Sequence, residues 1–502
     1  MNPETKLAHL KRLLTEYSDL VDTIGLLDWD METYMPPGGS SGRGFQKATI
    51  SRIAHLKLTS GEMGKLLEEL ISYEEELDPD SDDARLIRKA NRLYKKKSKV
   101  PADLAADIAK ATSDAYYVWV RARENSNFSE FQPALERILD LKRQLANCFQ
   151  PFDHIYDPLL DDYEPGLKTA DVQQIFASLR PEQVNLLQAI TQRPQVDDSF
   201  LHQDFEEKAQ WQFGVKVITD FGYDWNRGRQ DLTAHPFTQD IGLGDVRITT
   251  RVMNDYLPSA FFSTTHESGH AIYSQGMDRN LDRTPLAQGA SYAINESQSR
   301  MYENIIGRSR HFWLHYYPEL QSLFPAQLSQ VPLDMFYKAI NKVKPSFIRV
   351  EADEATYNMH IMMRLELEIA LLEGSLEVRD LPEAWNSSMH EYLGLTPPND
   401  AMGVLQDVHW SQGYFGYFST YALGNLIAAQ LWERMEEDLP DVFEQIGRGQ
   451  FSDLTAWMRE KVHRHGAKYE PQELVQRITG SKIDQRPYMR YLTNKYTEIY
   501  QL

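Results

Sequence analysis

Cysteine is almost absent from this sequence. Cys148 is the single cysteine among 502 residues, so the chain cannot form an internal disulfide. Chains without disulfides are typical of reducing compartments, whereas disulfide frameworks are typical of oxidising ones. We therefore expect a cytoplasmic protein, which at this length can bury a large apolar core.

Long apolar runs and an excess of positive charge are missing too. No segment approaches the roughly 20 apolar residues that a membrane-spanning helix requires. The N-terminal stretch is charged and amphipathic, so we expect no signal peptide there. The 53 basic and 73 acidic residues give a formal net charge of −20, which argues against nucleic acid and anionic membranes as main partners.

The chain does contain one complete HExxH motif, His266-Glu267-Ser268-Gly269-His270. In a helix, His266 and His270 lie one turn apart on the same face, where both imidazoles can reach one tetrahedral metal ion. Glu267 then lies beside the metal and can take a proton from a bound water, and zinc is the natural occupant. The alternative is a chance match, with two exposed histidines on a solvated helix.

Glu296 is the candidate for a third ligand. It follows His270 by 26 positions, and the turn-forming residues between them predict a break between two helices. A third glutamate ligand commonly comes from such a second helix. Taken without the HExxH motif, Glu296 would be read as an ordinary solvated carboxylate.

The periodicity of the whole chain predicts a mostly α fold, with about two-thirds helix or more. The pattern changes once, between residues 232 and 257, where residues 245–252 alternate as a β-strand does. An edge strand there could hold an extended peptide by backbone hydrogen bonds. No linker separates independent units, so we expect residues 1–502 to form a single domain.

Several further blocks occur in a fixed order along the chain. They are His235-Pro236-Phe237, Asp245-x-Arg247-x-Thr249, His266–His270, Asn295–Gln298, Ile348–Asp353 and Gly403–Trp410, preceded by Trp29-Asp30 and Met35–Gly38. Together they are similar to the HPF, DxRxT, HExxH, HESQ, IRxxAD and GxxQDxHW blocks of the carboxypeptidase Taq family of zinc metallocarboxypeptidases. The resemblance covers nearly the whole chain.

That resemblance carries several implications. It implies a helical, groove-bearing fold like that of neurolysin and angiotensin-converting enzyme, with N-terminal helices at about 1–150 covering part of the groove. The activity implied is release of C-terminal amino acids from peptides with broad specificity, proline being poor. One Zn²⁺ per subunit, which Co²⁺ can replace, and a homodimer are implied as well. The family has histidine where this chain has Asn295, so we expect tuned activity here.

The catalytic roles follow from the motif and from the blocks. Glu267 is the expected general base on a zinc-bound water. His409, inside a family block, and Tyr417 are the expected donors to the tetrahedral oxyanion. For Tyr417, an aromatic residue of the core or groove is an equal alternative. Glu303 could orient a ligand histidine, although a solvated helix carboxylate is the simpler reading.

An exopeptidase must also bind the free C-terminal carboxylate, which suits a bidentate arginine. Arg349 is the first candidate and Arg247, with Asp245 of the same block, is the second. The alternative for each arginine is a structural salt bridge, with Asp353 or Asp245 respectively. His235, in the HPF block, is expected to belong to a groove element that limits substrate length or position, unless the block is a plain turn.

Two other functions remain open at this point. An oligopeptidase with the same zinc chemistry would cut inside short peptides and release larger fragments instead of single amino acids. A non-catalytic helical scaffold would carry a vestigial metal site, and Asn295 is the one feature that leans toward it.

Overall fold

The computed structural model describes residues 2–502 and is mostly helical, with helix over 68% of the chain and one small sheet. The first helices are α1 (Pro3–Thr33), α2 (Ser40–Leu58), α3 (Gly61–Glu76), α4 (Asp82–Ser98), α5 (Ala102–Glu124), α6 (Phe128–Asn147), α7 (Asp157–Leu160), α8 (Thr169–Thr191) and α9 (Glu207–Asp220). The strands are β1 (Gln230–Leu232), β2 (Thr238–Asp240) and β3 (Val246–Thr250). The mostly α class with a small sheet is therefore confirmed.

The second half of the chain is helical. The central elements are α10 (Leu257–Gly276), α11 (Tyr292–Arg300), the π-helical segment η4 (Met301–Ile306), α12 (Arg310–Leu323), α13 (Pro325–Leu328), α14 (Leu333–Ile340) and α15 (Glu354–Glu373). The chain ends with α16 (Leu381–Leu393), α17 (Ser419–Asp438), α18 (Val442–Gly447), α19 (Ser452–Lys461), α20 (Pro471–Thr479) and α21 (Arg486–Tyr500). None of the helices in the described part of the chain is long and apolar enough to cross a membrane.

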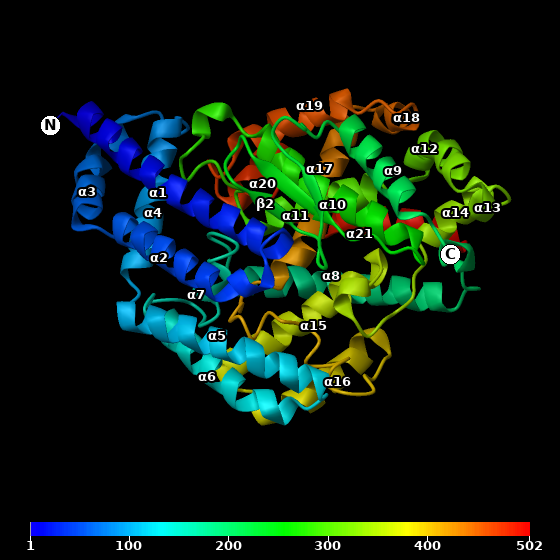
Figure 1. The fold of residues 1–502 in the computed structure, drawn as a ribbon, viewed down its shortest axis with the longest axis horizontal. Helices are drawn as coiled ribbons and strands as arrows, with labels where there is room; N and C mark the ends of the chain where they lie inside the picture. The colour runs from blue at the N-terminus through cyan, green and yellow to red at the C-terminus, as the bar shows by residue number, and fades with distance from the viewer. Residues whose placement is uncertain (1) are drawn as a thin grey trace.

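The N-terminal helices have a small core of their own. Leucines at helical spacing on α1 pack with residues of α3 and α4, whereas most of the other buried apolar side chains form one larger cluster. Figure 1 shows these first helices (blue) at one end of the molecule and α10 and α11 near its centre. The division into one domain and the groove cover stay predictions.

Helix α1 is longer than its sequence pattern indicates. The periodicity predicts an end near residue 28, but the helix continues to Thr33. Trp29 is the reason, because its buried ring lies under two guanidinium groups, Arg247 at 4.3 Å and Arg229 at 5.1 Å from the ring centroid. This tertiary contact stabilises the last turn of α1, which ends at Thr33, directly before the loop that the sequence predicts from Tyr34.

The sheet has the strand order β1-β3-β2. Strand β3 pairs in parallel with β1 and antiparallel with β2, so β2 is an edge strand. The strand predicted at 245–252 is present but shorter, from Val246 to Thr250. Val246 and Ile248 are fully buried in the main core, which places β3 beside α10 and the small sheet next to the HExxH helix.

Candidate metal centre

His266, Glu267 and His270 all lie in the middle of α10. Almost every residue of this helix is buried, so it runs through the core and its direction is fixed by packing on several sides. The two histidines lie one turn apart, as the HExxH spacing predicts, and their side chains are only partly exposed. The chance-match alternative of a solvated helix therefore does not describe α10.

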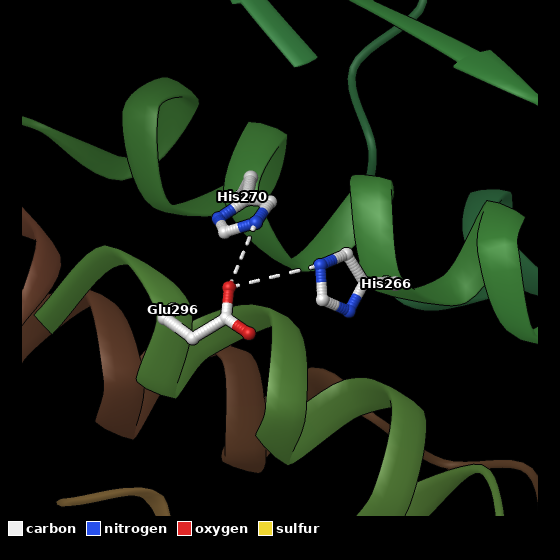
Figure 2. A group of neighbouring side chains, drawn as sticks. All are labelled: His266, His270 and Glu296. Atoms are coloured by element: carbon white, nitrogen blue, oxygen red, sulfur yellow. Dashed lines mark ion pairs between the residues drawn. The ribbon is translucent and has the colours of Figure 1, made fainter. Parts of the chain in front are cut away.

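The carboxylate of Glu296 on α11 faces both imidazoles, as Figure 2 shows. Its Oε2 lies 3.8 Å from His266 Nε2 and 3.6 Å from His270 Nε2. Two ligands each about 2.1 Å from a tetrahedral ion would lie about 3.4 Å apart, so the set is close to the spacing that a metal requires. Within residues 2–502 this is the one group of three or more histidine, cysteine or carboxylate side chains whose ligand atoms all lie within 4.8 Å of one another.

Two glycines allow α11 to lie where it does. A β-carbon at Gly269 of α10 would lie 2.6 Å from Ser299 Cα, and one at Gly424 of α17 would lie 2.6 Å from Glu296 Cγ. Real β-carbons essentially never approach so closely, so both helices touch α11 through bare backbone. The position of Glu296 is therefore set by helices α10 and α17 pressing on α11 from two directions.

Each histidine has a hydrogen-bond partner at its other ring nitrogen. His266 Nδ1 lies 2.9 Å from Glu303 Oε2, and His270 Nδ1 lies 2.9 Å from Asn295 Oδ1. Such partners fix the ring so that Nε2 faces the metal. Glu303 is thus placed to orient His266. Its solvated alternative is wrong, because its side chain is only 13% exposed and pairs with that histidine.

Asn295, which departs from the family pattern, is the hydrogen-bond partner of His270. Its amide oxygen is uncharged, so His270 donates to a neutral acceptor whereas His266 faces an anion. The two histidines of the candidate metal site therefore differ in the charge of their hydrogen-bond partners. The sequence pattern marked this position as unusual but could not identify the atom it contacts.

Arg300 connects the carboxylates beneath the cluster. Its Nε lies 2.6 Å from Glu296 Oε1 and its Nη1 lies 3.2 Å from Glu303 Oε2. Burial disfavours ionisation of Glu303, but the Arg300 guanidinium and His266 hold the pKa of that carboxyl well below its usual range. Both carboxylates therefore stay ionised, and Glu296 is held by its Oε1 while Oε2 faces the histidines. No motif in the sequence pointed to Arg300.

Glu267 has a partner on the edge strand. Thr238 Oγ1 lies 2.7 Å from Glu267 Oε2 and 3.0 Å from the backbone oxygen of the same residue. The threonine directly follows the His-Pro-Phe block, and nothing in the sequence pattern linked it to Glu267. In the described part of the chain no hydrogen bond reaches Glu267 Oε1.

His409 and Tyr417 lie together in an aromatic group. Their ring centroids are 5.5 Å apart, and Tyr421, which the sequence reading missed, lies 3.3 Å from His409 Nε2. Burial, together with the Arg349 guanidinium, lowers the pKa of His409 to about 3, and burial raises the pKa of Tyr417 well above its usual range. His409 is therefore a neutral imidazole and Tyr417 a protonated phenol at neutral pH.

Arg349 is paired with a different partner from the one expected. Its Nε and Nη2 each lie 2.9 Å from Asp407 Oδ1, whereas Asp353 caps α15 through the backbone of residues 355 and 356. Arg364 binds the other oxygen of Asp407. The Asp353 salt bridge is therefore wrong, because that carboxylate satisfies the free N–H groups at a helix start.

The Arg349 group is joined to the metal cluster by an aromatic bridge. Tyr357 accepts a hydrogen bond of 3.0 Å from Arg349 Nη1, and the guanidinium of Arg300 lies 4.4 Å from the centre of its ring. Arg349 is almost fully buried. Together with Arg364 it surrounds the buried carboxylate of Asp407, so the three side chains form a buried charged network.

The second arginine lies on the sheet. Arg247 Nε and Nη2 bind Asp245 at 2.7 and 2.6 Å, as the salt-bridge alternative predicts, and its guanidinium covers Trp29. His235 is exposed and lies in the loop between β1 and β2, whose end is held by a bond of 2.9 Å from Phe237 N to Thr249 Oγ1. Arg247 and His235 thus lie on the small sheet and in its β1–β2 loop, and among residues 2–502 they share no hydrogen-bond partner with Arg349.

A cavity of about 490 Å³ lies between α4 and residues 149–168. Its cations include Arg92 and Lys96, both of which pair with Asp161 at 2.6 and 2.8 Å. Two cations of α4 are thus paired with the segment that the helix covers. None of the three candidate metal ligands lines this cavity.

Comparison with known sequences gives a consistent result. Residues 9–496 match the model of the carboxypeptidase Taq (M32) metallopeptidase family. The chain is 39% identical to Thermostable carboxypeptidase 1 of Thermus thermophilus, with 100% of both chains covered. It is 40% identical to Carboxypeptidase 1 of Bacillus subtilis, with 98% of both covered.

Solved structures agree with the sequences. The M32 carboxypeptidase from Deinococcus radiodurans is 39% identical, with 99% of this chain and 100% of that chain covered and a TM-score of 0.96. The Pyrococcus furiosus carboxypeptidase is 34% identical, with 99% of both chains covered and a TM-score of 0.94. The cluster on α10 and α11 therefore lies in a fold that these carboxypeptidases share, and the chain belongs to the carboxypeptidase Taq family of metallopeptidases.

Proposed function

We propose that the protein is a zinc-dependent metallocarboxypeptidase that removes single residues from the C-termini of peptides, with broad specificity and poor action on proline. Family membership makes the chain a metallopeptidase, and thus a peptide hydrolase. The observation that carries the proposal is the convergence of ligand atoms from His266, His270 and Glu296 beside Glu267. A cytoplasmic homodimer forming one domain per chain is part of the same proposal.

The donor set supports zinc as the resident metal. Two imidazole nitrogens and one carboxylate oxygen suit Zn²⁺, and three protein ligands leave a position open, as catalytic zinc sites do. When bound, zinc polarises the peptide carbonyl and makes the attacking water more acidic. His266, His270 and Glu296 would hold it, and Co²⁺ could replace it because it accepts similar ligands.

Glu267 is the proposed general base. Its Oε2 is held by Thr238, so Oε1 is the oxygen left to take a proton from the attacking water. The same carboxyl then passes that proton to the leaving amine. His409 and Tyr417 both carry a proton at neutral pH, so each is suited to donate a hydrogen bond to the tetrahedral oxyanion.

Arginine is the proposed anchor for the substrate's C-terminal carboxylate. Arg349 uses three of its five N–H bonds on Asp407 and Tyr357, which leaves two on the Nη atoms. Arg247 is the rival, and Asp245 and His235 complete the proposed substrate-binding set on the sheet side. The structural pairing of each arginine keeps it rigid, which favours a fixed distance between anchor and scissile bond.

A product analysis tests the function. The purified protein with zinc is incubated with a peptide of about eight residues whose N-terminus is blocked, and the products are weighed by mass spectrometry over time. Stepwise loss of single C-terminal residues is expected, and a chelator should stop it. Internal fragments would establish the oligopeptidase alternative. If no hydrolysis occurred at all, the non-catalytic scaffold would be the remaining hypothesis.

Two substitutions separate the metal from the base. Glu296→Ala should lose both bound zinc and activity, because two histidines alone hold zinc weakly. Glu267→Gln should keep stoichiometric zinc while kcat falls by orders of magnitude. If Glu296→Ala still bound stoichiometric zinc, another residue would be the third ligand. If zinc-loaded Glu267→Gln kept substantial turnover, Glu267 would not be the general base.

A further inference from the structure

The hydroxyl of Thr238 lies within hydrogen-bond distance of two acceptors. It lies 2.7 Å from Glu267 Oε2 and 3.0 Å from the Glu267 backbone oxygen, and a threonine has one proton to donate. The shorter contact is to the carboxylate, and hydrogen bonds to ionised acceptors are the stronger ones. The carboxylate is therefore the principal acceptor, and this bond fixes the rotation of the Glu267 side chain.

Thr238 begins a strand that is too short to be rigid alone. Strand β2 has three residues and lies at the edge of the sheet, where Thr238 pairs with Ile248 and Asp240 pairs with Val246. A three-residue edge strand has neighbours on one side, so its position depends on other contacts. Ser274 Oγ of α10 supplies one, at 2.9 Å from Asp240 Oδ2.

Helix α1 supplies another contact on β2, through backbone. A β-carbon at Gly25 would lie 2.7 Å from Gln239 Nε2 and 2.9 Å from the backbone oxygen of Asp240. One turn further along α1, Trp29 lies against Arg247 of β3 at 4.3 Å. Gly25 and Trp29 thus present one face of α1 to both β2 and β3, more than 200 residues away in sequence.

We propose that Thr238 is a positioning residue for Glu267, and that α1 holds Thr238 in place through the Gly25 contact with β2. The inference rests on the proposed role of Glu267 as the base. It assigns the N-terminal helix an indirect part in the chemistry, because a shift of α1 moves the strand that positions the carboxylate. The direction in which Oε1 points is fixed only while Oε2 is held.

The first test compares Thr238→Val with Thr238→Ser in the zinc-loaded enzyme. Valine keeps the shape and removes the donor, so kcat should fall about 10- to 100-fold, with KM, zinc content and the thermal midpoint unchanged. Serine keeps the donor and should recover most of the loss. A valine variant with wild-type kcat, or a serine variant as poor as valine, would overturn the proposal.

A double substitution ties the effect to Glu267. In a Glu267→Gln background the carboxylate is already gone, so Thr238→Val should cause no more than about a twofold further loss. An undiminished loss there means that Thr238 acts elsewhere, and the inference fails while the base assignment stands. High turnover of Glu267→Gln itself would instead remove the base assignment, so the two failures are distinguishable.

The second test addresses α1 with two helical glycines. Gly25→Ala should lower kcat several-fold because the new methyl group pushes on Asp240, and it should add little to the loss in Thr238→Val. Gly44→Ala in α2 is the matched control, since a β-carbon there meets nothing within 4 Å. Equal kcat in the two alanine variants would show that α1 does not control the base.

Discussion

Gly424 faces Glu296 so closely that a β-carbon at 424 would lie 2.6 Å from Glu296 Cγ and 2.7 Å from its Cβ. The missing side chain on α17 makes room for the proposed metal ligand on α11. Gly424 affects Glu296 through packing alone, because the two residues meet at carbon atoms. It shows how the metal cluster depends on a helix that carries none of the proposed ligands.

Gly424→Ala should therefore displace Glu296 and weaken zinc binding at least about tenfold, because a carboxylate moved by even 1 Å no longer shares an ion with the two histidines. Competition with a chromogenic chelator measures the zinc affinity without relying on activity. Gly44→Ala, at an open helical position, serves as the control and should bind zinc normally. Unchanged affinity in Gly424→Ala would contradict the packing argument.

Asn295 should set the strength of the His270 bond to the metal. Asn295→Leu keeps the branched shape of the side chain but removes the acceptor at His270 Nδ1, so zinc affinity should fall about 10- to 100-fold. Asn295→Asp supplies an anionic acceptor and should bind zinc at least as tightly as wild type. Equal zinc affinity in the leucine and aspartate variants would show that this hydrogen bond does not support the metal.

Glu164 should make stability depend on pH. Its fully buried carboxyl accepts a 2.6 Å hydrogen bond from Ala293 N at the start of α11, and burial raises its pKa from 4.5 to about 8. Between these two values the folded protein binds more protons than the unfolded chain does. The free energy of unfolding should therefore fall as pH rises from about 4.5 to about 8, and level off above.

Glu164→Gln is the test of this pH dependence. The amide oxygen can still accept from Ala293 N, but the group no longer titrates. Urea unfolding at several pH values from 5 to 9 should show the variant gaining on wild type by up to a few kcal/mol, at about 1.4 kcal/mol per pKa unit. Parallel profiles for the two proteins would mean that Glu164 has an ordinary pKa.

Arg349→Ala tests the carboxylate anchor. A charge-assisted hydrogen bond contributes about 1.5–3 kcal/mol, so kcat/KM on a blocked dipeptide acid should fall about ten- to several-hundred-fold. On the corresponding amide, wild type and variant should be similarly poor, because the charge is already absent. Arg247→Ala is the rival measurement, and a selective loss there alone would make Arg247 the anchor.

Because Arg349 also neutralises Asp407, its removal needs a structural control. Arg364→Lys keeps a cation beside Asp407 and reports how much the network itself matters. Arg349→Ala should keep wild-type zinc affinity. If Arg349→Ala lost zinc and thermal stability, and lost activity on the acid and on the amide alike, the arginine would be structural. Efficient cleavage of the amide by wild type would favour the oligopeptidase alternative.

Local pattern was sufficient for part of this site. His266 and His270 are four residues apart, and a helix brings that spacing onto one face whatever surrounds it. The alternation after residue 245 likewise predicted β3, because the period of a strand is a local property. The ordered blocks identified the family, and with it the mostly helical fold that the structure has.

Tertiary packing decided the rest. That Glu296 faces the histidines depends on two glycines, one of them on a helix more than 100 residues away, and that Arg349 pairs with Asp407 depends on a loop 58 residues away. The hydrogen bond from Thr238 to Glu267 exists because an edge strand lies against α10, with α1 behind it. No periodicity encodes such contacts, since they arise where separate elements meet, and the sequence determines them only through the packing of the whole chain.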